Sequence, residues 1–481
     1  MRSTLVLAQV LAFALAACGP QRPPLTPETR AAYHDLRVAP ERCREPAAEV
    51  TRAQAVRDLN VLERVLTRGY AGYGLHSPER VRDAMGEARG SLPDSPLSPA
   101  AFREHLFRHI AFLDDNHVGL WFYDDEGRHF RATSQHRQAY LADARFERTP
   151  GGFQDSEGRQ LVACGDRAPE AILRPVAAPP SVAWAPILLS PERVNALSCT
   201  VTRGERQEEV VYPARRLGLG RSGGPPFERA DAPFPWLRVR TLAYSRRGAL
   251  EAFVESAEQV RDAPVVVLDL RRAGGGSDRF LVRWFSRLTS RELSYWAVED
   301  LRSEVTLQGA LNFWGCVRSF SGADAGGREW LDGRVGRAER ELSQAMRDRG
   351  PFRAVLPGHV TLEGRAPTPF TGKLILLVDR GCASACETSV MLARQIPGAI
   401  VVGENTEGTM KVGELRWYRL PESGLWLSAG TRVHRDPNPN GGFAEGRGFL
   451  PDLWLDGRDV DATVRALATC LTDGTCAPPP R

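Results

Sequence analysis

The sequence predicts a mixed α/β protein of several domains, on the basis of its buried-strand segments, its helical periodicity and its length. Nearly continuous apolar runs at residues 265–270, 374–378 and 400–403 are typical of strands buried on both faces of a sheet. Apolar side chains within residues 55–66 and 102–110 recur instead at helical spacing. The 481 residues, 42% of them apolar, are enough for about three domains with a sizeable core.

Periodicity and turn-forming residues divide the chain into expected domains. Residues 48–135 are expected to form an N-terminal helical domain, because their apolar side chains follow a helical repeat. Residues 140–216 carry short strand-like segments between proline-rich loops and are expected to form a small β-rich domain. Residues 217–481 alternate strand and helix and are expected to form the main core, with residues 290–351 as an insertion of unassigned role.

The N-terminus has the pattern of an export signal. Arg2 precedes a mostly apolar run at residues 5–17, which is as long as the core of a signal peptide and too short to cross a bilayer. The run ends at Leu15-Ala16-Ala17-Cys18. This segment resembles the lipobox of bacterial lipoproteins, in which the signal is cleaved before a cysteine that receives the lipid.

We therefore predict a signal peptide at residues 1–18 and a flexible tether at residues 19–47, which are rich in proline, arginine and alanine. Cys18 is the predicted lipid-attachment site and the only predicted contact with a membrane. Gly19 is not the aspartate that commonly retains lipoproteins in the inner membrane. We therefore expect an envelope protein on the outer membrane, facing the periplasm or the cell surface. The alternative is a plain secretory signal with an incidental Cys18.

Charge and composition exclude several classes of protein. The net charge is +4, and 63 basic residues are scattered among 59 acidic ones without a long block of one sign, so the chain has no electrostatic footprint for nucleic acid. Only Lys373 and Lys411 are lysines, so lysine-based catalysis has two candidates. The chain has no pair of CxxC units, and we expect neither a metal site nor a cofactor.

Cysteine usage agrees with export. Eight cysteines follow Cys18, and an even number in an exported chain favours disulfides. The sequence does not determine their pairing, but short separations favour two local pairs. These are Cys164 with Cys199 and Cys470 with Cys476.

Two segments of the core carry residues suited to nucleophilic catalysis. The strand that begins near residue 265 ends in glycines 274–276, whose N–H groups can bind an anion, although such glycines more often form a tight turn. The strand at residues 374–378 leads to Ser384, where a helix is expected to begin and to stabilise negative charge at its N-terminus. Ser384 and Glu387 also have the spacing of a capping box, which needs no catalysis. These residues alone do not decide between the two roles.

Four motifs occur in the order found in one peptidase family. They are Asp269-Leu270-Arg271 with Gly274-Gly275-Gly276, Ala383-Ser384-Ala385 with Glu387, Gly403-Glu404-Asn405-Thr406-Glu407-Gly408, and Gly448-Phe449-Leu450-Pro451-Asp452. This series resembles the tail-specific (C-terminal processing) and tricorn-type serine peptidases. The resemblance covers about residues 50–460, with specific motifs only in the second half.

The resemblance implies a fold and a reaction. Members share a crotonase-like (ClpP/crotonase-type) α/β core, cleave peptides or proteins through a serine acyl-enzyme and use no metal. Within the β-rich domain, Gly165-Asp166-Arg167 and Val210-Val211-Tyr212 resemble parts of a PDZ module. An ordinary β-rich insert would show the same segments.

The resemblance also assigns roles to residues. Ser384 is the implied nucleophile, and the amides of Ala385 and Gly275 are the implied oxyanion donors. Gly276 is an alternative to Gly275, because the run of glycines leaves the register open by one residue.

The choice of base separates two branches of the family. Tail-specific proteases have a lysine directly after the glycine that matches Gly408, but this chain has Thr409 there. Lys411 lies two positions further on. A shift of two residues along a strand keeps the same face but moves the side chain by about 6.6 Å, too far for an unchanged hydrogen bond.

The tricorn-type branch uses a histidine from the N-terminal region, within a short acidic and polar motif. Residues 114–119, Asp-Asp-Asn-His-Val-Gly, look like this motif and make His117 the implied base for Ser384. Free serine is a poor nucleophile, so the reaction needs such a base within hydrogen-bond reach. Outside this resemblance, a lone histidine near a helix end is more often a cap or a surface residue. Asn116 stands where the tricorn site has a serine, and its role stays open.

An acidic residue behind the histidine completes the tricorn-type site. Glu445 is the best match by order and is implied to orient His117, directly or through another polar side chain; a plain surface glutamate is the alternative. His105 and His109 have a metal-like spacing of four, but no glutamate follows His105 as a zinc protease requires. We expect both histidines on a helix surface.

Three functions are compatible with these residues. The first is a serine endopeptidase or carboxyl-terminal processing enzyme of the cell envelope, with Ser384 and His117. The second has the same fold and a Ser384–Lys411 dyad. The third is a catalytically inactive relative that binds a peptide or an apolar ligand in the cleft.

Overall fold

The computed structural model describes most of the chain after its N-terminus. The described residues are 35–133, 137–220, 223–231, 233–347, 354–358, 361–362, 364–436 and 442–476. The predicted signal peptide, Cys18 and the first part of the predicted tether lie outside this range. Among the described helices, none has the length and apolar character needed to cross a membrane.

The core is a mainly parallel sheet. Its parallel strands are β12 (Trp236–Val239), β13 (Val265–Asp269), β18 (Lys373–Val378), β19 (Ala399–Gly403) and β22 (Leu453–Trp454), in that order, with β11 (Phe227–Ala230) antiparallel at the edge. β13, β18 and β19 correspond to the three apolar runs of the sequence and confirm that prediction. The mixed α/β class is therefore confirmed.

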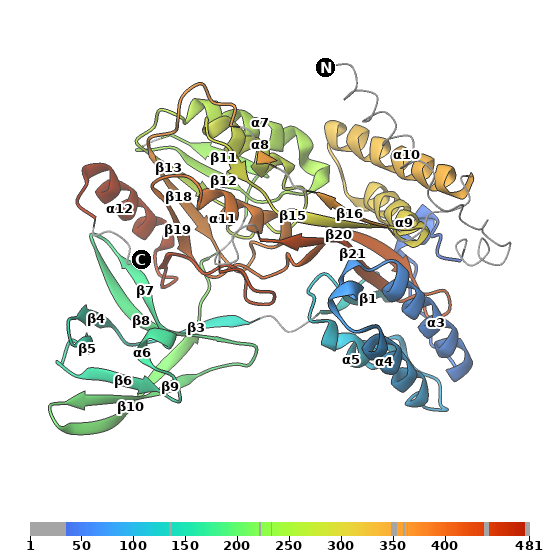
Figure 1. Cartoon of the computed structure of the whole chain (residues 1–481), viewed down its shortest axis with the longest axis horizontal. Coiled ribbons are helices and arrows are strands. Elements are labelled where there is room, and N and C mark those ends of the chain that lie inside the picture. Colours follow the sequence, from blue (N-terminus) through green and yellow to red (C-terminus); the bar gives the residue numbers. More distant parts are fainter. Residues whose placement is uncertain are drawn as a thin grey trace, which may run out of the picture.

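Helices cover both faces of this sheet, which explains the continuous apolar runs. In β13, Val266 and Leu268 pack into one hydrophobic cluster, whereas Val265 and Val267 pack into a cluster on the opposite face. Every second side chain therefore meets a different helical layer. The first face is covered by α7 (Arg247–Gln259), α8 (Arg279–Leu288) and α11 (Glu387–Ala393), and the second by α12 (Val460–Asp473) (Figure 1).

The N-terminal part packs as a separate helical cluster beside a second sheet. Its helices are α3 (Arg52–Arg68), α4 (Pro78–Gly90) and α5 (Pro99–Ile110), with short turns η1 (Pro40–Arg44), η2 (Ala71–Leu75) and η3 (Ala111–Leu113). It continues into β1 (Gly119–Tyr123) and β2 (His129–Thr133), so this part is not purely helical. β1 pairs antiparallel with β21 (Trp426–Arg435), which joins the beginning of the chain to its last quarter.

The second sheet brings distant segments together. Besides β1, β2 and β21 it contains β15 (Ala297–Arg302), β16 (Ala354–Gly358) and β20 (Val412–Arg419). β20 and β21 are antiparallel partners over most of their length. Because the loop before β1 and the loop before β20 meet at this sheet, residues near 117 and near 410 become neighbours.

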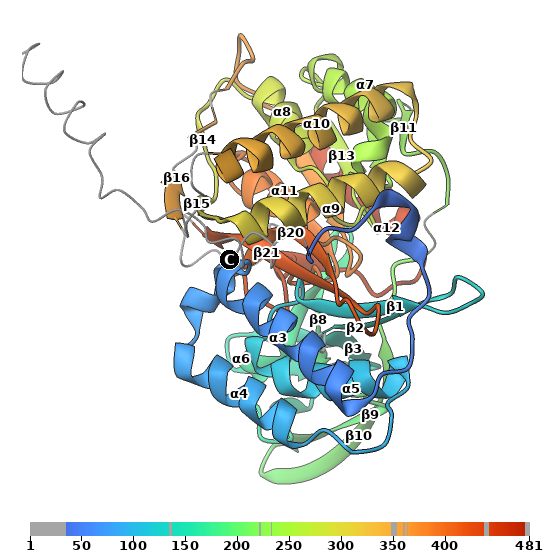
Figure 2. The same ribbon diagram turned by 90° about the vertical axis from the view of Figure 1, so that its right-hand side faces the viewer.

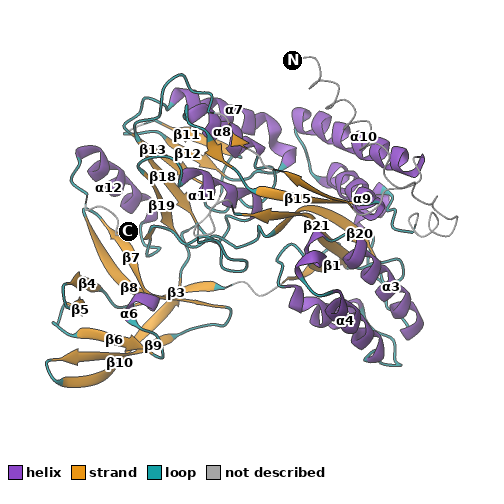
Figure 3. Ribbon diagram, viewed as in Figure 1, coloured by secondary structure: helices purple, strands orange, loops and turns teal. Residues whose placement is uncertain are grey.

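The β-rich segment forms a lobe in which strands predominate (Figure 3). Its elements are β3 (Gln138–Ala142), β4 (Phe146–Thr149), β5 (Gly152–Asp155), β6 (Gln160–Cys164), α6 (Pro169–Ile172), β7 (Leu173–Ala178), β8 (Ser181–Ser190), β9 (Ala196–Arg203) and β10 (Arg206–Arg216). β7 pairs parallel with β22 of the core, so the lobe continues the central sheet.

Two helices of the predicted insertion lie side by side over the second sheet (Figures 1 and 2). α9 (Glu304–Phe320) packs against β20, and α10 (Ala325–Arg347) packs against α9 and the η4 turn (Tyr244–Arg246). Two short strands flank these helices in the sequence and pair with each other. They are β14 (Leu293–Ser294) and β17 (Thr361–Leu362). This segment, unassigned from sequence, therefore covers one side of the cleft described below.

Four disulfide bonds cross-link the described residues. Cys164–Cys199 joins β6 to β9, and Cys470–Cys476 closes the end of α12, so both predicted pairs are confirmed. Cys43–Cys316 ties η1 to α9, and Cys382–Cys386 lies at the start of α11. The sequence analysis predicted neither pair. Cys43 and Cys316 are 273 residues apart and become close only after folding. Cys382 and Cys386 are four residues apart, so this pair was missed although short separation favoured it.

Candidate active site

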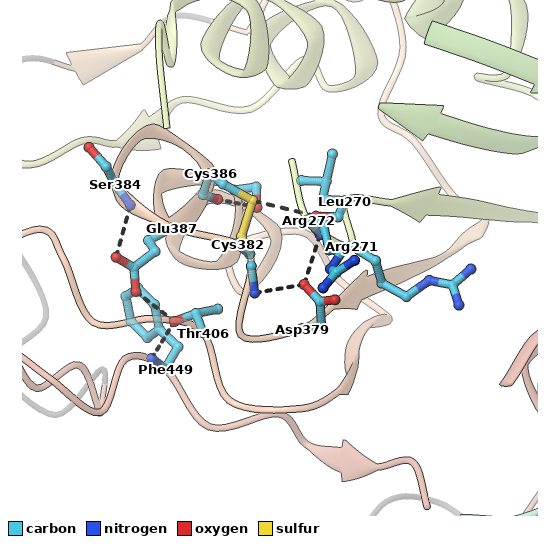
Figure 4. The surroundings of a disulfide bond; sticks show 12 residues. Leu270, Arg271, Arg272, Asp379, Cys382, Ser384, Cys386, Glu387, Thr406 and Phe449 are labelled. Atoms are coloured by element: carbon cyan, nitrogen blue, oxygen red, sulfur yellow. Dashed lines mark hydrogen bonds between the residues drawn. A yellow bond between two sulfur atoms is a disulfide. The ribbon is translucent and has the colours of Figure 1, made fainter. Parts of the chain in front are cut away.

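Ser384 lies in a tight turn between β18 and α11, in the short turn η5 (Ser384–Cys386). Its φ angle of 52° is in the left-handed region, which a non-glycine residue rarely adopts and which concentrates at functional sites. The backbone N–H of Ser384 donates to Glu387 Oε2 at 3.1 Å, which is one half of a capping box. The hydroxyl does not complete that box. Figure 4 shows it directed away from Glu387.

His117 supplies the partner of that hydroxyl. Its Nε2 lies 3.1 Å from Ser384 Oγ, across a sequence separation of 267 residues. The loop that carries it is fixed by Asp115, which accepts hydrogen bonds from the His117 N–H and from the Tyr70 hydroxyl, both at 2.8 Å. Ser428 Oγ donates to the His117 carbonyl at 2.7 Å. Hydrogen bonds therefore fix the backbone of His117 at both its N–H and its carbonyl group, and so position the imidazole.

The tautomer of His117 follows from its second contact. Nδ1 lies 2.5 Å from the Val412 carbonyl oxygen, and a carbonyl only accepts, so Nδ1 carries the proton. Nε2 is then a bare acceptor that faces the Ser384 hydroxyl. Burial lowers the pKa of His117 to about 4, because the charged form would lose its hydration. The ring is neutral near pH 7, as a general base must be.

Two backbone amides lie beside the serine. A Cβ atom on Gly275 would stand 3.2 Å from Ser384 Cβ and 3.7 Å from Ser384 Oγ, a tight contact that glycine avoids. Gly276 instead pairs with Leu242 in a β-bridge. Within the described part of the chain, neither the Gly275 nor the Ala385 N–H donates to a backbone acceptor. Both residues line the cavity that Ser384 faces.

Glu445 is close to the site but does not contact the imidazole. Its carboxylate accepts the N–H groups of Asn116 at 3.2 Å, Met410 at 3.2 Å and Lys411 at 2.9 Å. These belong to the loops on either side of His117 and Val412. Glu445 therefore ties the two segments that set the imidazole position. Burial and the nearby charge of Asp115 raise the pKa of Glu445 well above its usual range.

Lys411 is placed differently from His117. Its backbone contacts Glu445 and the N–H of His434, and its side chain is absent from the lining of the catalytic cavity. No hydrogen bond joins Lys411 to Ser384 among the described residues. The structure thus brings His117, and not Lys411, into contact with the serine.

Glu387 has a positioning role that the sequence did not reveal. The side chain is fully buried and accepts four hydrogen bonds, from the Ser384, Gly408 and Thr409 N–H groups and the Thr406 hydroxyl. Burial raises its pKa to about 7, while the four donors favour its ionised form. It ties the nucleophile turn to the 406–409 loop. The spacing of three residues between Ser384 and Glu387 was the sequence signal that could have revealed this contact.

The serine opens into a cleft of about 450 Å³. Its lining includes His117, Ser384 and the glycine turn, together with Phe313 and Trp314 from α9. Among the described residues, no group of histidine, cysteine or acidic side chains is arranged to hold a metal ion.

One expectation about the histidines is wrong. His105 is buried, with 7% of its surface exposed, and its Nε2 donates to the Ala88 carbonyl at 2.8 Å. It packs between α5 and α4 and is not a surface residue. His109 is partly exposed and its Nε2 lies 3.2 Å from Ser91 Oγ.

The α/β core and its serine-centred cleft are those of a serine-type peptidase. Residues 236–455 match the family model described as Peptidase family S41. This match confirms the resemblance to the tail-specific peptidases that the motifs indicated. No curated protein sequence is significantly similar to the chain.

The chain is similar to several solved structures, at low identity. Mature CPAF complexed with lactacystin is 15% identical, with 88% of this chain and 99% of that chain covered and a TM-score of 0.46. The photosystem II D1 C-terminal processing protease is 14% identical, with coverages of 88% and 99% and a TM-score of 0.39. The tricorn protease is 9% identical, with coverages of 88% and 37% and a TM-score of 0.38.

Proposed function

We propose that the protein cleaves peptides or proteins in the bacterial cell envelope through a Ser384 acyl-enzyme, with His117 as the general base. The observation that carries the proposal is the 3.1 Å contact between His117 Nε2 and Ser384 Oγ. The bare Nε2, set by the Nδ1 contact with the Val412 carbonyl, makes the ring ready to accept the serine proton.

The reaction proceeds in two halves. The Ser384 oxygen attacks the substrate carbonyl while its proton passes to His117 Nε2, and the developing oxyanion binds the N–H groups of Gly275 and Ala385. The imidazolium then gives this proton to the leaving amine, which releases the first product. Water, deprotonated by the same Nε2, hydrolyses the ester and restores the serine. Glu445 acts as a positioning residue, since its contacts are with the backbone around the ring.

Architecture and location complete the proposal. We propose domain limits at 48–135, 140–216 and 217–481, with a crotonase-like core, supported by the parallel sheet between helices, and a PDZ-like insert, supported by its strand-rich lobe. We also propose export, lipid attachment at Cys18 and an outer-membrane location, which rest on the sequence of residues 1–19. Incorporation of a labelled fatty acid into the full chain, and its loss in Cys18→Ser, tests the anchor.

Three single variants test the mechanism. Each is assayed for labelling by a fluorophosphonate probe and for hydrolysis of a fluorogenic peptide taken from a library screen. Ser384→Ala should abolish labelling, and His117→Ala should lower the hydrolysis rate by about a thousandfold or more, because removing a triad member removes most of the catalysis. Lys411→Ala should retain activity. Loss of activity in Lys411→Ala with full activity in His117→Ala would establish the lysine dyad. A wild-type chain that neither labels nor hydrolyses would be a binding protein.

A further inference from the structure

The catalytic cleft has a basic extension. A second cavity of about 350 Å³ lies against α9, α10 and the second sheet. It shares lining residues with the catalytic cavity, so the two cavities adjoin. The shared residues are Trp314, Glu414, Arg416 and Arg432. The arginines of the second cavity are Arg302, Arg334, Arg337, Arg416 and Arg432, against the acidic residues Asp300, Glu341 and Glu414.

The acidic residues are already paired with particular arginines. Asp300 binds Arg432 through two contacts of 2.6 and 2.9 Å. Glu414 lies 3.6 Å from Arg416 and 3.5 Å from Arg432, and Glu341 lies 3.9 Å from Arg302. Within the described part of the chain, Arg334 and Arg337 take part in no ion pair. The net positive charge of the extension is therefore concentrated at these two residues of α10.

Arg334 is held ready for a ligand. Its guanidinium lies 4.6 Å from the ring centroid of Trp314 and 5.6 Å from that of Trp330, and Trp330 stacks on Tyr244. Its Nε is buried without a hydrogen-bond partner. A guanidinium that is fixed by aromatic rings, partly desolvated and unpaired binds a carboxylate at little cost in conformational entropy.

We propose that Arg334 and Arg337 form a subsite for a carboxylate of the substrate, so that the enzyme selects peptides with negative charge at a fixed distance from the scissile bond. The subsite rests on the proposed peptidase function, since Ser384 lines the adjoining cavity. The carboxylate belongs either to an acidic side chain or to the C-terminus of the peptide. Both have the planar pair of oxygens that a guanidinium fork matches.

Matched peptides test the subsite. A peptide cleaved by the wild-type enzyme is varied from Gln to Glu at each position in turn, and from C-terminal amide to free acid in a separate set. In the wild type, we expect a negative charge at one position of the peptide to raise kcat/KM at least tenfold. The same peptide should gain much less in the double variant Arg334→Gln/Arg337→Gln. Arg334→Lys should keep part of the preference, because it keeps the charge without the fork. Arg340→Gln is the control, since Arg340 is exposed on the same helix outside the cavity.

The outcomes separate the subsite from the peptidase itself. Which set of peptides shows the preference identifies the carboxylate as side-chain or terminal. A wild type without any preference for negative charge, or a preference that survives in Arg334→Gln/Arg337→Gln, overturns the proposal. Fluorophosphonate labelling of Ser384 should be normal in every arginine variant. Absence of labelling in the wild type would instead count against the proposed function.

A separate observation concerns the disulfide Cys382–Cys386, which spans the nucleophile. It closes the segment Cys382-Ala383-Ser384-Ala385-Cys386, and both sulfur-bearing side chains are fully buried (Figure 4). The Ser384 φ of 52° within this segment is unfavourable for a residue with a side chain. Surrounding contacts must therefore hold the turn. Besides the disulfide, they include the Ser384 N–H bond to Glu387, the Cys386 N–H bond to the Ala383 carbonyl at 3.0 Å and the Glu407 N–H bond to the Cys382 carbonyl at 3.0 Å.

We infer that this disulfide is a positioning element, which holds Ser384 in reach of His117 and beside the Gly275 amide. Cross-linking the two ends of the turn removes conformations in which the serine relaxes out of the left-handed region. Without it, the hydroxyl reaches the productive geometry in a smaller fraction of molecules. The consequence is a lower kcat with little change in KM, because the walls of the cleft come from other segments.

Two pairs of alanine variants test this inference. Cys382→Ala/Cys386→Ala should show at least a tenfold lower kcat and a slower rate of fluorophosphonate labelling, with KM within about twofold of the wild type. The control is Cys470→Ala/Cys476→Ala, which removes a disulfide of similar span, six residues against four, at the end of α12. It should label at the wild-type rate. Circular dichroism and thermal unfolding verify that both are folded. A folded Cys382→Ala/Cys386→Ala chain that labels at the wild-type rate refutes the positioning role.

If that double variant does not fold, partial reduction of the wild-type chain with dithiothreitol gives the same comparison. Mass spectrometry follows the opening of each disulfide, and the rate of fluorophosphonate labelling is measured in parallel. A labelling rate that stays constant as Cys382–Cys386 opens refutes the positioning role.

Discussion

The burial of His117 determines how far the pH can fall before the enzyme loses activity. His117 has 5% of its surface exposed, and burial lowers its pKa from 6.5 to about 4. That shift corresponds to about 3.4 kcal/mol against protonating the ring in place. At pH 5.5, about 97% of such rings are neutral, compared with about 9% for an ordinary imidazole of pKa 6.5. We therefore expect kcat/KM to remain near its maximum at pH 5.5 and to fall only as the pH approaches 4.

The assay is hydrolysis of a fluorogenic peptide, together with the rate of fluorophosphonate labelling, from about pH 3.5 to 8. A depressed histidine pKa contributes stability that is present above about 6.5 and is lost as the pH falls toward 4, so unfolding must be followed in parallel. Recovery of activity on return to pH 7 separates protonation from irreversible unfolding. Burial raises the pKa of Asp115 to about 6 and that of Glu387 to about 7, so Asp115→Asn and Glu387→Gln separate the titration of these carboxyl groups from that of the ring. An acid limb near 6.5 in the wild type and in both variants would refute the argument.

Three further predictions concern the scaffold of the site. Cys43→Ser/Cys316→Ser should lower the free energy of unfolding by about 2–5 kcal/mol, since this disulfide closes a loop of 273 residues. Denaturant titration measures the change, and an unchanged midpoint would contradict the prediction. Gly403→Ala should cost about 1–3 kcal/mol and reduce soluble yield, because its φ is 130° and the added methyl would lie 1.9 Å from a carbonyl of β18. Asp269→Asn should destabilise by about 1.5–3 kcal/mol, because the buried Arg271 guanidinium loses the charge of one of its two carboxylate partners and keeps Asp461 at 2.7 Å; equal thermal stability would show that the Asp269–Arg271 pair contributes nothing.

Local patterns in the sequence were sufficient for several elements. The apolar runs at β13, β18 and β19 predict buried strands, since a strand covered on both faces has no polar alternation. The two local disulfides followed from short separation. Local pattern was insufficient for His105, because a helix position alone does not reveal which face another helix covers.

The candidate site divides in the same way. Its residues were named from motifs, but the spacing of Ser384 and Glu387 fitted a cap as well as a nucleophile. Only the folded chain shows a hydroxyl that turns away from Glu387 toward His117. The same holds for Glu445, whose contacts with three backbone N–H groups could not be read from its order in the chain.

The sequence by itself determined the class of the fold, the resemblance to a peptidase family and the residue types available for chemistry, because strand burial, turn-forming glycines and short motifs are properties of local sequence. The tertiary structure decided which of those residues meet. Pairing of β1 with β21 carries His117 across 267 residues to Ser384, and packing of α9 and α10 adds the adjoining arginine-lined cavity. Contacts of this kind depend on how distant segments pack, which no local pattern specifies.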